Sequence, residues 1–316
     1  MTPFAFVFPG QGSQAVGMLD AWGDHPAVRE TLQEASDALN EDIGALIHAG
    51  PKEALALTTN TQPVMLVAGV AAWRAWRAEG GTVPAVAAGH SLGEYSALVA
   101  AGVLTLAQAA PLVRFRAAAM QDAVAVGAGA MAAILGMNAA TVVAGCAQVQ
   151  AGFAADSGEV VEAVNFNDPA QTVIAGSKEA VARACEALKA AGAKRALPLP
   201  VSAPFHSSLM KPAAERLRER LAATPMAAPA FPVINNIDVA AETDPVRIRD
   251  SLYRQAFGPV RWTECVAAIK ARGVTTIVEC GPGKVLAGLC KRIDSELSAA
   301  SLYDPTTLAD VKGLLA

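Results

Sequence analysis

The predicted fold is organised around the stretch Gly89-His90-Ser91-Leu92-Gly93, which reads G-x-S-x-G between two segments of different character. Residues 83–88 before it form an apolar run, and residues 94–101 after it are rich in helix formers. A strand, a sharp turn and a helix in this order are the setting of a nucleophile elbow, where flanking glycines make room for a strained serine backbone. The helix that begins there directs its free N–H groups towards an oxyanion formed on the serine. The stretch therefore predicts a nucleophilic Ser91 exposed above a sheet; a serine in an ordinary glycine-flanked turn is the alternative.

The composition is that of a well-buried globular protein. Of the 316 residues, 53% are hydrophobic and 17% are charged, which suits one large or two moderate domains. The net charge of −4 gives no sign of nucleic-acid binding. The N-terminus lacks a signal-peptide pattern, and the longest apolar stretch, residues 123–137, is too short to span a membrane. We therefore expect a cytoplasmic protein with neither a membrane nor a nucleic-acid partner.

The cysteines and histidines show no disulfide or metal-binding pattern. The five cysteines are scattered and form no C-x-x-C, which is typical of reduced thiols in the cytosol. The four histidines lack H-x-x-x-H spacing, and the glycines near Lys284 do not have the spacing of a phosphate loop. We therefore expect no metal and no cofactor.

The order of predicted elements changes near residue 127. From there the chain reads strand, helix, strand, strand, helix and strand up to residue 198, which is the βαββαβ pattern of a ferredoxin-like unit. A proline-rich connection over residues 197–204 then leads back to the larger body. In the flanking parts the patterns predict strands at 4–8, 231–236 and 275–279, and helices at 28–39, 61–76, 105–120, 211–223, 248–255 and 263–272, with a last core helix opening at 284.

A serine nucleophile needs a general base, and elimination leaves His206 as the best candidate. His90 adjoins Ser91, so its side chain should point away from the serine, while His25 and His48 lie in polar helical surroundings far upstream. His206 lies in a loop beside the small unit, and catalytic residues concentrate on such loops. An ordinary loop histidine is the alternative. About a third of the chain follows His206 and the His-Gly-Gly motif of lipases is missing, so the chain departs from the usual α/β hydrolase.

Five motifs in order resemble the malonyl-CoA:acyl-carrier-protein transacylase family almost end to end. They are Phe8-Pro9-Gly10-Gln11-Gly12-Ser13-Gln14, Gly89-His90-Ser91-Leu92-Gly93-Glu94, Asn165-Phe166-Asn167, Phe205-His206-Ser207 and Glu279-Cys280-Gly281-Pro282-Gly283-Lys284-Val285-Leu286. The resemblance implies an α/β fold, with an α/β-hydrolase-like larger subdomain around a parallel sheet (1–126 and 200–316) and an inserted ferredoxin-like subdomain (127–199). It also implies transfer of a malonyl group from malonyl-CoA to the phosphopantetheine thiol of acyl carrier protein, by a ping-pong route through a malonyl-serine, for fatty-acid synthesis.

The resemblance further implies roles for single residues. Ser91 is similar to the family's nucleophile and His206 to its general base. A backbone carbonyl near Gln255, in place of a carboxylate, would orient that histidine. The backbone N–H groups of Gln11 and Leu92 would form the oxyanion hole, with Gln11 also among the substrate-binding residues.

Two further residues of the resemblance concern specificity. Arg116, four residues before Met120-Gln121, fits the family's arginine better than Arg114 does. A planar guanidinium can hold the malonyl carboxylate with two parallel hydrogen bonds, which selects a diacid thioester over an acetyl one. Phe205 resembles the malonyl type, because relatives that use methylmalonyl carry serine there; a pocket rejects one methyl group by only ~1–3 kcal/mol.

The family's carrier protein is acidic, so exposed basic residues are candidate docking groups. A solvated basic face is the alternative for each of them, and we expect a monomer. Three other functions stay open: a serine esterase or thioesterase, which leaves Arg116 unexplained, a silent module that binds CoA or a carrier protein, and a malonyltransferase of a polyketide pathway. The basic candidates are Lys189, Lys194, Arg195, Lys284, Lys291 and Arg292.

Overall fold

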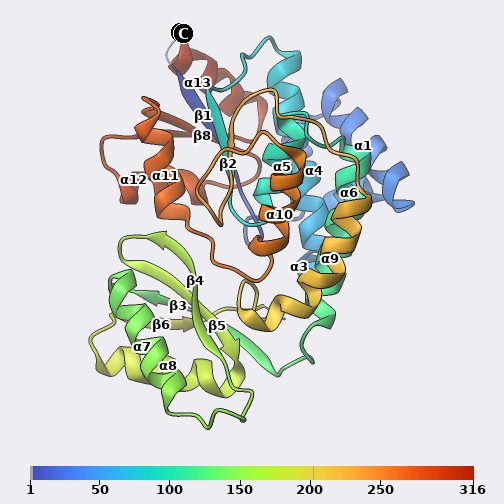
Figure 1. The fold of residues 1–316 in the computed structure, drawn as a ribbon. Coiled ribbons are helices and arrows are strands. Elements are labelled where there is room, and N and C mark those ends of the chain that lie inside the picture. Colours follow the sequence, from blue (N-terminus) through green and yellow to red (C-terminus); the bar gives the residue numbers. More distant parts are fainter. Residues whose placement is uncertain (1–2, 202) are drawn as a thin grey trace.

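The apolar run at the start of the chain forms β1 (Phe4–Phe8), the middle strand of a five-stranded sheet. The computed structural model describes residues 3–201 and 203–316 (Figure 1). All neighbouring strands of this sheet run parallel. Their order is β7 (Val233–Ile234), β2 (Val86–Gly89), β1, β8 (Thr276–Cys280) and β9 (Ser298–Leu302).

Alternate residues of β1 pack on opposite faces of the sheet. The ring of Phe6 contacts Trp73 and Trp76 of α4 (Thr58–Ala78) at centroid distances of 5.7 and 5.8 Å. Val7 packs on the other face, in a cluster with Trp262 of α11 (Trp262–Ala271). Figure 1 shows α11 and α12 (Val285–Ile293) on one side of the sheet, and α4 and α5 (Gly93–Ala100) on the other. Burial of both faces explains why the strand is apolar at every position.

The other helices of the larger unit surround this core. The helices α1, α6 and α9 lie beyond α4, on the side away from α12 (Figure 1). The larger unit also contains α1 (Pro26–Leu39), α2 (Ile43–Ala49), α3 (Lys52–Ala56), α6 (Leu106–Asp122), α9 (Lys211–Ala223), α10 (Pro245–Gln255) and α13 (Pro305–Leu315), with 3₁₀ turns at Asp20–Trp22 and Ser208–Met210.

The smaller unit is a four-stranded antiparallel sheet with two helices packed on one face. Its strands lie in the order β4-β5-β3-β6, which is the ferredoxin-like arrangement that the βαββαβ pattern predicts. The predicted fold class, a parallel α/β unit with a ferredoxin-like one, is therefore confirmed. The elements in chain order are β3 (Gly129–Leu135), α7 (Ala139–Ala151), β4 (Val161–Asp168), β5 (Gln171–Ser177), α8 (Lys178–Ala190) and β6 (Arg195–Pro198).

The predictions missed four elements of the larger unit. The helices α2 and α3 have only seven and five residues, too few for a helical period to stand out. The chain also continues past the last predicted core helix into β9 and α13. The strand β9 reads Ser-Ala-Ala-Ser-Leu and lies at the edge of the sheet, so it lacks the apolar run of a central strand.

The end of β4 joins the two units. The backbone N–H of Val260 donates to Val164 O over 2.8 Å, and Val260 O accepts from the N–H of Phe166 over 2.9 Å. The carboxylate of Asp168, which is 5% exposed, pairs with Arg292 of α12 at 2.7 Å. These contacts hold the smaller sheet against the larger unit. Within the described residues, no helix is both long enough and apolar enough to cross a membrane.

Candidate active site

The turn between β2 and α5 places Ser91 in a left-handed backbone conformation, with φ 52°. A Cβ atom on Gly89 would lie 1.9 Å from the carbonyl carbon of Gly93, and one on Gly93 would lie 2.0 Å from Phe8 O. Only glycine fits either position, because contacts this short are with backbone atoms that cannot move aside. The two glycines of G-x-S-x-G therefore permit the close packing of turn, helix and β1.

His206 lies against Ser91 although it comes from the loop that leaves the smaller unit. Its Nε2 is 2.7 Å from Ser91 Oγ, while its Nδ1 is 2.9 Å from Gln255 O and 3.2 Å from Gly258 O. Carbonyl oxygens only accept hydrogen bonds, so Nδ1 carries the proton and Nε2 presents a lone pair to the serine hydroxyl. Two backbone carbonyls thus orient the ring, a task that a carboxylate performs in a Ser-His-Asp triad.

Burial is the main influence on the imidazole of His206, which is 4% exposed. Desolvation, followed by the positive charge of Arg116, lowers its pKa to about 3. The hydrogen bonds to the carbonyls of Gln255 and Gly258 act in the opposite direction and are weaker. The ring is therefore neutral at neutral pH and able to accept a proton from Ser91.

Arg116 of α6 is 2% exposed and projects into the same site. Its Nη1 donates to Gln62 Oε1 over 2.6 Å, and its Nη2 donates to Gln255 Oε1 over 3.1 Å and to Ser91 Oγ over 3.2 Å. The guanidinium also lies over the ring of Tyr95, 5.6 Å from its centroid. Among the residues that the structure describes, no carboxylate pairs with Arg116. The buried carboxylate of Glu94 acts on this cation only from beyond ion-pair distance. A buried guanidinium that no carboxylate contacts is suited to binding an anionic ligand.

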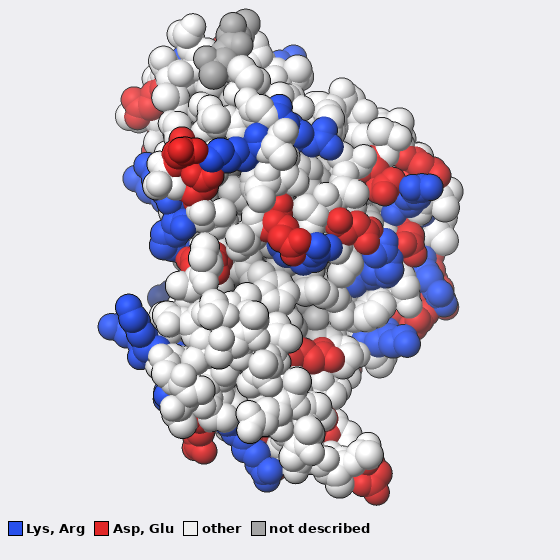
Figure 2. Space-filling model, turned by 60° about the vertical axis from the view of Figure 1, so that its left-hand side comes forward, with Lys and Arg blue, Asp and Glu red and all other residues white. Residues whose placement is uncertain are grey.

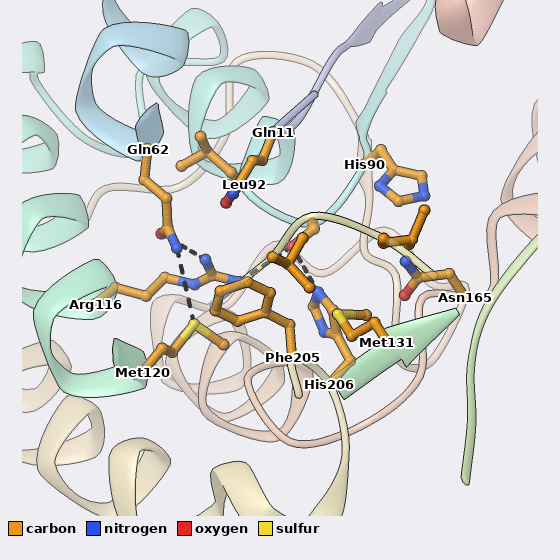
Figure 3. Close-up of a pocket in the computed structure, with 13 residues that line it drawn as sticks. Gln11, Gln62, His90, Leu92, Arg116, Met120, Met131, Asn165, Phe205 and His206 are labelled. Carbon is orange, nitrogen blue, oxygen red and sulfur yellow. Dashed lines mark hydrogen bonds between the residues drawn. The ribbon is translucent and has the colours of Figure 1, made fainter. Parts of the chain in front are cut away.

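A cavity of about 130 Å³ opens between the two units at this point. Figure 3 shows Gln62, Arg116 and Met120 at one end and His90 and Asn165 at the other. The lining consists of Gln11, Gln62, His90, Ser91, Leu92, Arg116, Met120, Met131, Asn165, Leu199, Val201, Phe205 and His206.

Two backbone amides next to the nucleophile are available to a ligand. Gln11 and Leu92 both line the cavity, and Leu92 directly precedes α5. No hydrogen bond from either amide occurs within residues 3–201 and 203–316. The first turn of α5 adds a positive dipole end at the same place. The cavity therefore contains the donors that an oxyanion needs.

The sequence reasoning missed two polar residues around the nucleophile, Asn236 and Gln62, and it foresaw the backbone carbonyl of Gln255 but not its side chain. Asn236 accepts the N–H of Ser91 on Oδ1 over 2.7 Å and donates from Nδ2 to Gly89 O over 2.7 Å. Gln62 and the side chain of Gln255 hold Arg116. The one signal in the sequence was the polar pair at 235–236 directly after a buried strand, while Gln62 lies in a helix with no distinguishing pattern.

His90 points away from Ser91, and its Nε2 donates to Asn167 Oδ1 over 2.9 Å. Burial lowers its pKa. In the described part of the chain, no group of three or more metal-ligating side chains occurs.

The chain is similar over nearly its whole length to proteins of known function. The model of the acyl transferase domain family matches residues 5–302. The malonyl CoA-acyl carrier protein transacylase of Salmonella typhimurium is 54% identical over 98% of each chain. A crystal structure of an acyl-carrier-protein S-malonyltransferase from Burkholderia pseudomallei is 62% identical, with a TM-score of 0.95 over 98% of this chain and 99% of the other. A malonyl-transacylase solved with its type II polyketide synthase acyl-carrier protein is 51% identical, with a TM-score of 0.94 over 98% of both chains.

Proposed function

Since the chain belongs to the family of malonyl CoA-acyl carrier protein transacylases, we propose that Ser91, His206 and Arg116 carry out its reaction. The chain is an acyltransferase, which moves a malonyl group from malonyl-CoA to acyl carrier protein and supplies extender units for fatty-acid synthesis. One set of contacts around Ser91 supports the assignment of these residues. Ser91 Oγ lies 2.7 Å from a neutral imidazole nitrogen and 3.2 Å from a buried guanidinium.

The first half-reaction forms a malonyl-serine. His206 Nε2 takes the proton of Ser91 Oγ as the oxygen attacks the thioester carbonyl. The negative charge moves to the carbonyl oxygen, where the amides of Gln11 and Leu92 and the N-terminus of α5 stabilise it. The C–S bond then breaks, and the leaving CoA thiolate receives the proton from His206. The enzyme is left as an ester with His206 neutral again.

The second half-reaction reverses these steps with another thiol. His206 Nε2 takes the proton of the phosphopantetheine thiol as the sulfur attacks the serine ester. The oxyanion collapses, the C–O bond breaks, and the Ser91 oxygen recovers the proton. Because the intermediate is a serine ester that water could also cleave, the enzyme has to favour the carrier's thiol over water. Apolar Met120, Met131 and Phe205 around the cavity support that preference.

Arg116 binds the free carboxylate of the malonyl group. Two parallel hydrogen bonds from a guanidinium suit a planar carboxylate, and burial strengthens them. Phe205, 8% exposed, lines the cavity and limits the space for an α-methyl group. An unbranched α-carbon and a negative charge are therefore selected together.

Five exposed basic residues are the proposed docking groups for the acidic carrier protein: Lys189, Lys194, Arg195, Lys284 and Lys291. Figure 2 shows Lys and Arg side chains along the left-hand edge of one face, above and below the boundary between the two units. In the described part of the chain none of the five pairs with a carboxylate. Arg292 is a weaker candidate than the sequence suggested, because its Nε already pairs with Asp168.

We further propose a cellular location, an oligomeric state and subdomain bounds for this chain. The chain acts as a cytoplasmic monomer, and its subdomains are 1–126 with 200–316, and 127–199. The 51% identical transacylase that was solved with a polyketide synthase carrier favours a polyketide pathway as the second candidate function. The two pathways share the chemistry and differ in the carrier protein.

Intact mass spectrometry tests the residue assignment. After mixing with malonyl-CoA, the parent protein should gain one malonyl group, and Ser91→Ala should gain none. Added phosphopantetheinylated carrier protein should then discharge the adduct. Loss of the adduct to water as fast as it forms would instead support an esterase or thioesterase.

A further inference from the structure

A buried carboxylate beside the nucleophile has no role in the mechanism above. Glu94 lies on the first turn of α5, three residues after Ser91, and is 1% exposed. In the described residues no lysine or arginine pairs with it. Its Oε2 accepts two hydrogen bonds, from Gln255 Nε2 over 2.9 Å and from the backbone N–H of Asn236 over 2.8 Å. A buried acidic group retained at this place calls for a function.

The side-chain amide of Gln255 connects Glu94 to Arg116. Gln255, the last residue of α10, is fully buried. Its Nε2 donates to Glu94 Oε2 and also to Ser91 O over 3.0 Å, so both amide hydrogens are used on one side. Its Oε1 therefore faces the other way, where it accepts from Arg116 Nη2. The orientation of this amide depends on having two acceptors on the side of Glu94.

We propose that Glu94 is a specificity-determining positioning residue, which holds the Gln255 amide so that its oxygen aims the Arg116 guanidinium into the cavity. The proposal rests on the roles assigned above to Ser91 and Arg116. Without an acceptor at position 94, one amide hydrogen of Gln255 loses its partner and the amide is free to turn. Arg116 then keeps Gln62 as its one firm side-chain acceptor, and the guanidinium no longer points at the substrate carboxylate.

The proposed role of Glu94 depends more on Oε2, the oxygen that accepts both hydrogen bonds, than on the charge of the carboxylate. Burial raises the pKa of Glu94 to about 7, while Gln255, Asn236 and the charge of Arg116 lower it and Asp238 raises it. Tyr95 and Cys265 are the other titratable groups beside the carboxylate. In either protonation state Oε2 can accept both hydrogen bonds when the proton sits on Oε1. A glutamine oxygen at the same place can do so as well, which makes Glu94→Gln the matched control for Glu94→Leu.

Two substrates separate positioning of Arg116 from integrity of the elbow. Malonyl-CoA needs Arg116, whereas acylation of Ser91 by p-nitrophenyl acetate needs Ser91 and His206 but no carboxylate contact. For Glu94→Leu we expect kcat/KM for malonyl-CoA to fall by about tenfold or more, mainly through KM, with the ester rate within about twofold of the parent. Glu94→Gln should keep both rates within about threefold.

A double-mutant cycle tests the route through Gln255. In a Gln255→Leu background, Glu94→Leu should lower the malonyl-CoA rate by less than about twofold more, because the amide that it positions is gone. If the effects of the two substitutions instead multiplied in the double variant, that result would overturn the proposal. So would a parallel fall of both rates in Glu94→Leu, unchanged rates in that variant, or a Glu94→Gln variant as impaired as Glu94→Leu.

The proposal stays testable if one variant fails to fold, and its failure differs from a failure of the residue roles. If circular dichroism shows that Glu94→Leu is unfolded, the other two variants still test the proposal. Gln255→Leu must lose malonyl-CoA turnover selectively, and Glu94→Gln must retain malonyl-CoA turnover. Failure of the residue roles themselves would look different: the parent protein would form no malonyl adduct at Ser91.

Discussion

The guanidinium of Arg116 reaches the nucleophile itself, with Nη2 donating to Ser91 Oγ over 3.2 Å. On the roles proposed above, the group that binds the substrate's carboxylate is thus within hydrogen-bond distance of the atom that attacks its carbonyl. In malonyl thioesters one methylene separates the carboxylate from that carbonyl, so a carboxylate held by Arg116 brings the carbonyl to Ser91 Oγ. Binding energy at the carboxylate is converted directly into alignment of the reacting atoms.

Replacing Arg116 by lysine should impair malonyl transfer without abolishing the nucleophile. A lysine keeps the charge but not the planar pair of donors, and hydrogen bonds to charged groups contribute about 1.5–3 kcal/mol, or ~10- to 100-fold in rate. We expect kcat/KM for malonyl-CoA to fall by that factor in steady-state assays. Acylation of Ser91 by p-nitrophenyl acetate serves as the control and should change little; an equal loss there would mean that Arg116 mainly supports the elbow.

In the pH–rate profile of Ser91 acylation, the fall in rate on the acid side should begin only at an unusually low pH. The folded-state pKa of His206 is lowered to about 3 by burial and then by Arg116, so the neutral, proton-accepting form persists well below neutral pH. Ester acylation of Ser91 should therefore stay nearly level from pH 8 down to roughly 5. Arg116→Ala removes one cause of the lowered pKa and should move this fall in rate towards higher pH. A fall near pH 6.5 in the parent would contradict this description of the site.

Gly89→Ala should prevent or strongly destabilise folding, because the added Cβ would lie 1.9 Å from backbone atoms of Gly93. We expect a loss of at least ~3 kcal/mol in the free energy of unfolding measured in urea. Gly313→Ala is the matched control, since nothing lies within 4 Å of a Cβ there and the residue is inside α13. That substitution should stabilise by about 0.5–1 kcal/mol, because alanine is the better helix former.

The buried carboxyl of Glu279 should make stability depend on pH. Burial raises its pKa from 4.5 to about 7, even though Oε2 accepts the N–H of Ala287 at the start of α12. A folded-state pKa above the unfolded value means that the native state binds the proton more tightly. This contribution is complete below about pH 4.5 and is lost as pH rises through 7.

Glu279→Gln removes this proton uptake. In urea unfolding between pH 5 and 7.5, the parent should lose more stability with rising pH than the variant, by an amount on the order of 1–3 kcal/mol. Equal slopes for the two proteins would show that Glu279 ionises alike in the folded and unfolded states.

Charge reversal at the proposed docking groups should affect only the second half-reaction. Lys194→Glu with Lys284→Glu should raise KM for the carrier protein by about tenfold at low salt, with less effect as ionic strength rises. The rate of Ser91 malonylation by malonyl-CoA should not change. Arg29→Glu is the control, because Arg29 is an exposed basic residue of α1, on the side of the larger unit away from α12 (Figure 1). An equal rise in KM from Arg29→Glu would indicate a nonspecific charge effect.

Much of the fold could be predicted because its signals are local. The strand β1, the helix α9 and the βαββαβ order of the smaller unit each follow from a run or period within a few residues. The pairing Ser91–His206 was also within reach, since a G-x-S-x-G stretch demands a base and few histidines compete. The short helices and the edge strand β9 gave too weak a pattern to be found.

Local sterics and periodicity in the sequence dictate the elbow at Ser91 and most of the order of elements. The other long-range partners around the site are brought together by the tertiary structure. It brings Gln255 O to His206 across 49 residues and Gln255 Nε2 to Ser91 O across 164. Such contacts depend on how the end of α10 packs beside the loop of His206, a consequence of the whole chain's path and not of any local pattern. The same packing buries Arg116 with no carboxylate of the described residues within ion-pair distance, which a linear pattern of residues does not encode.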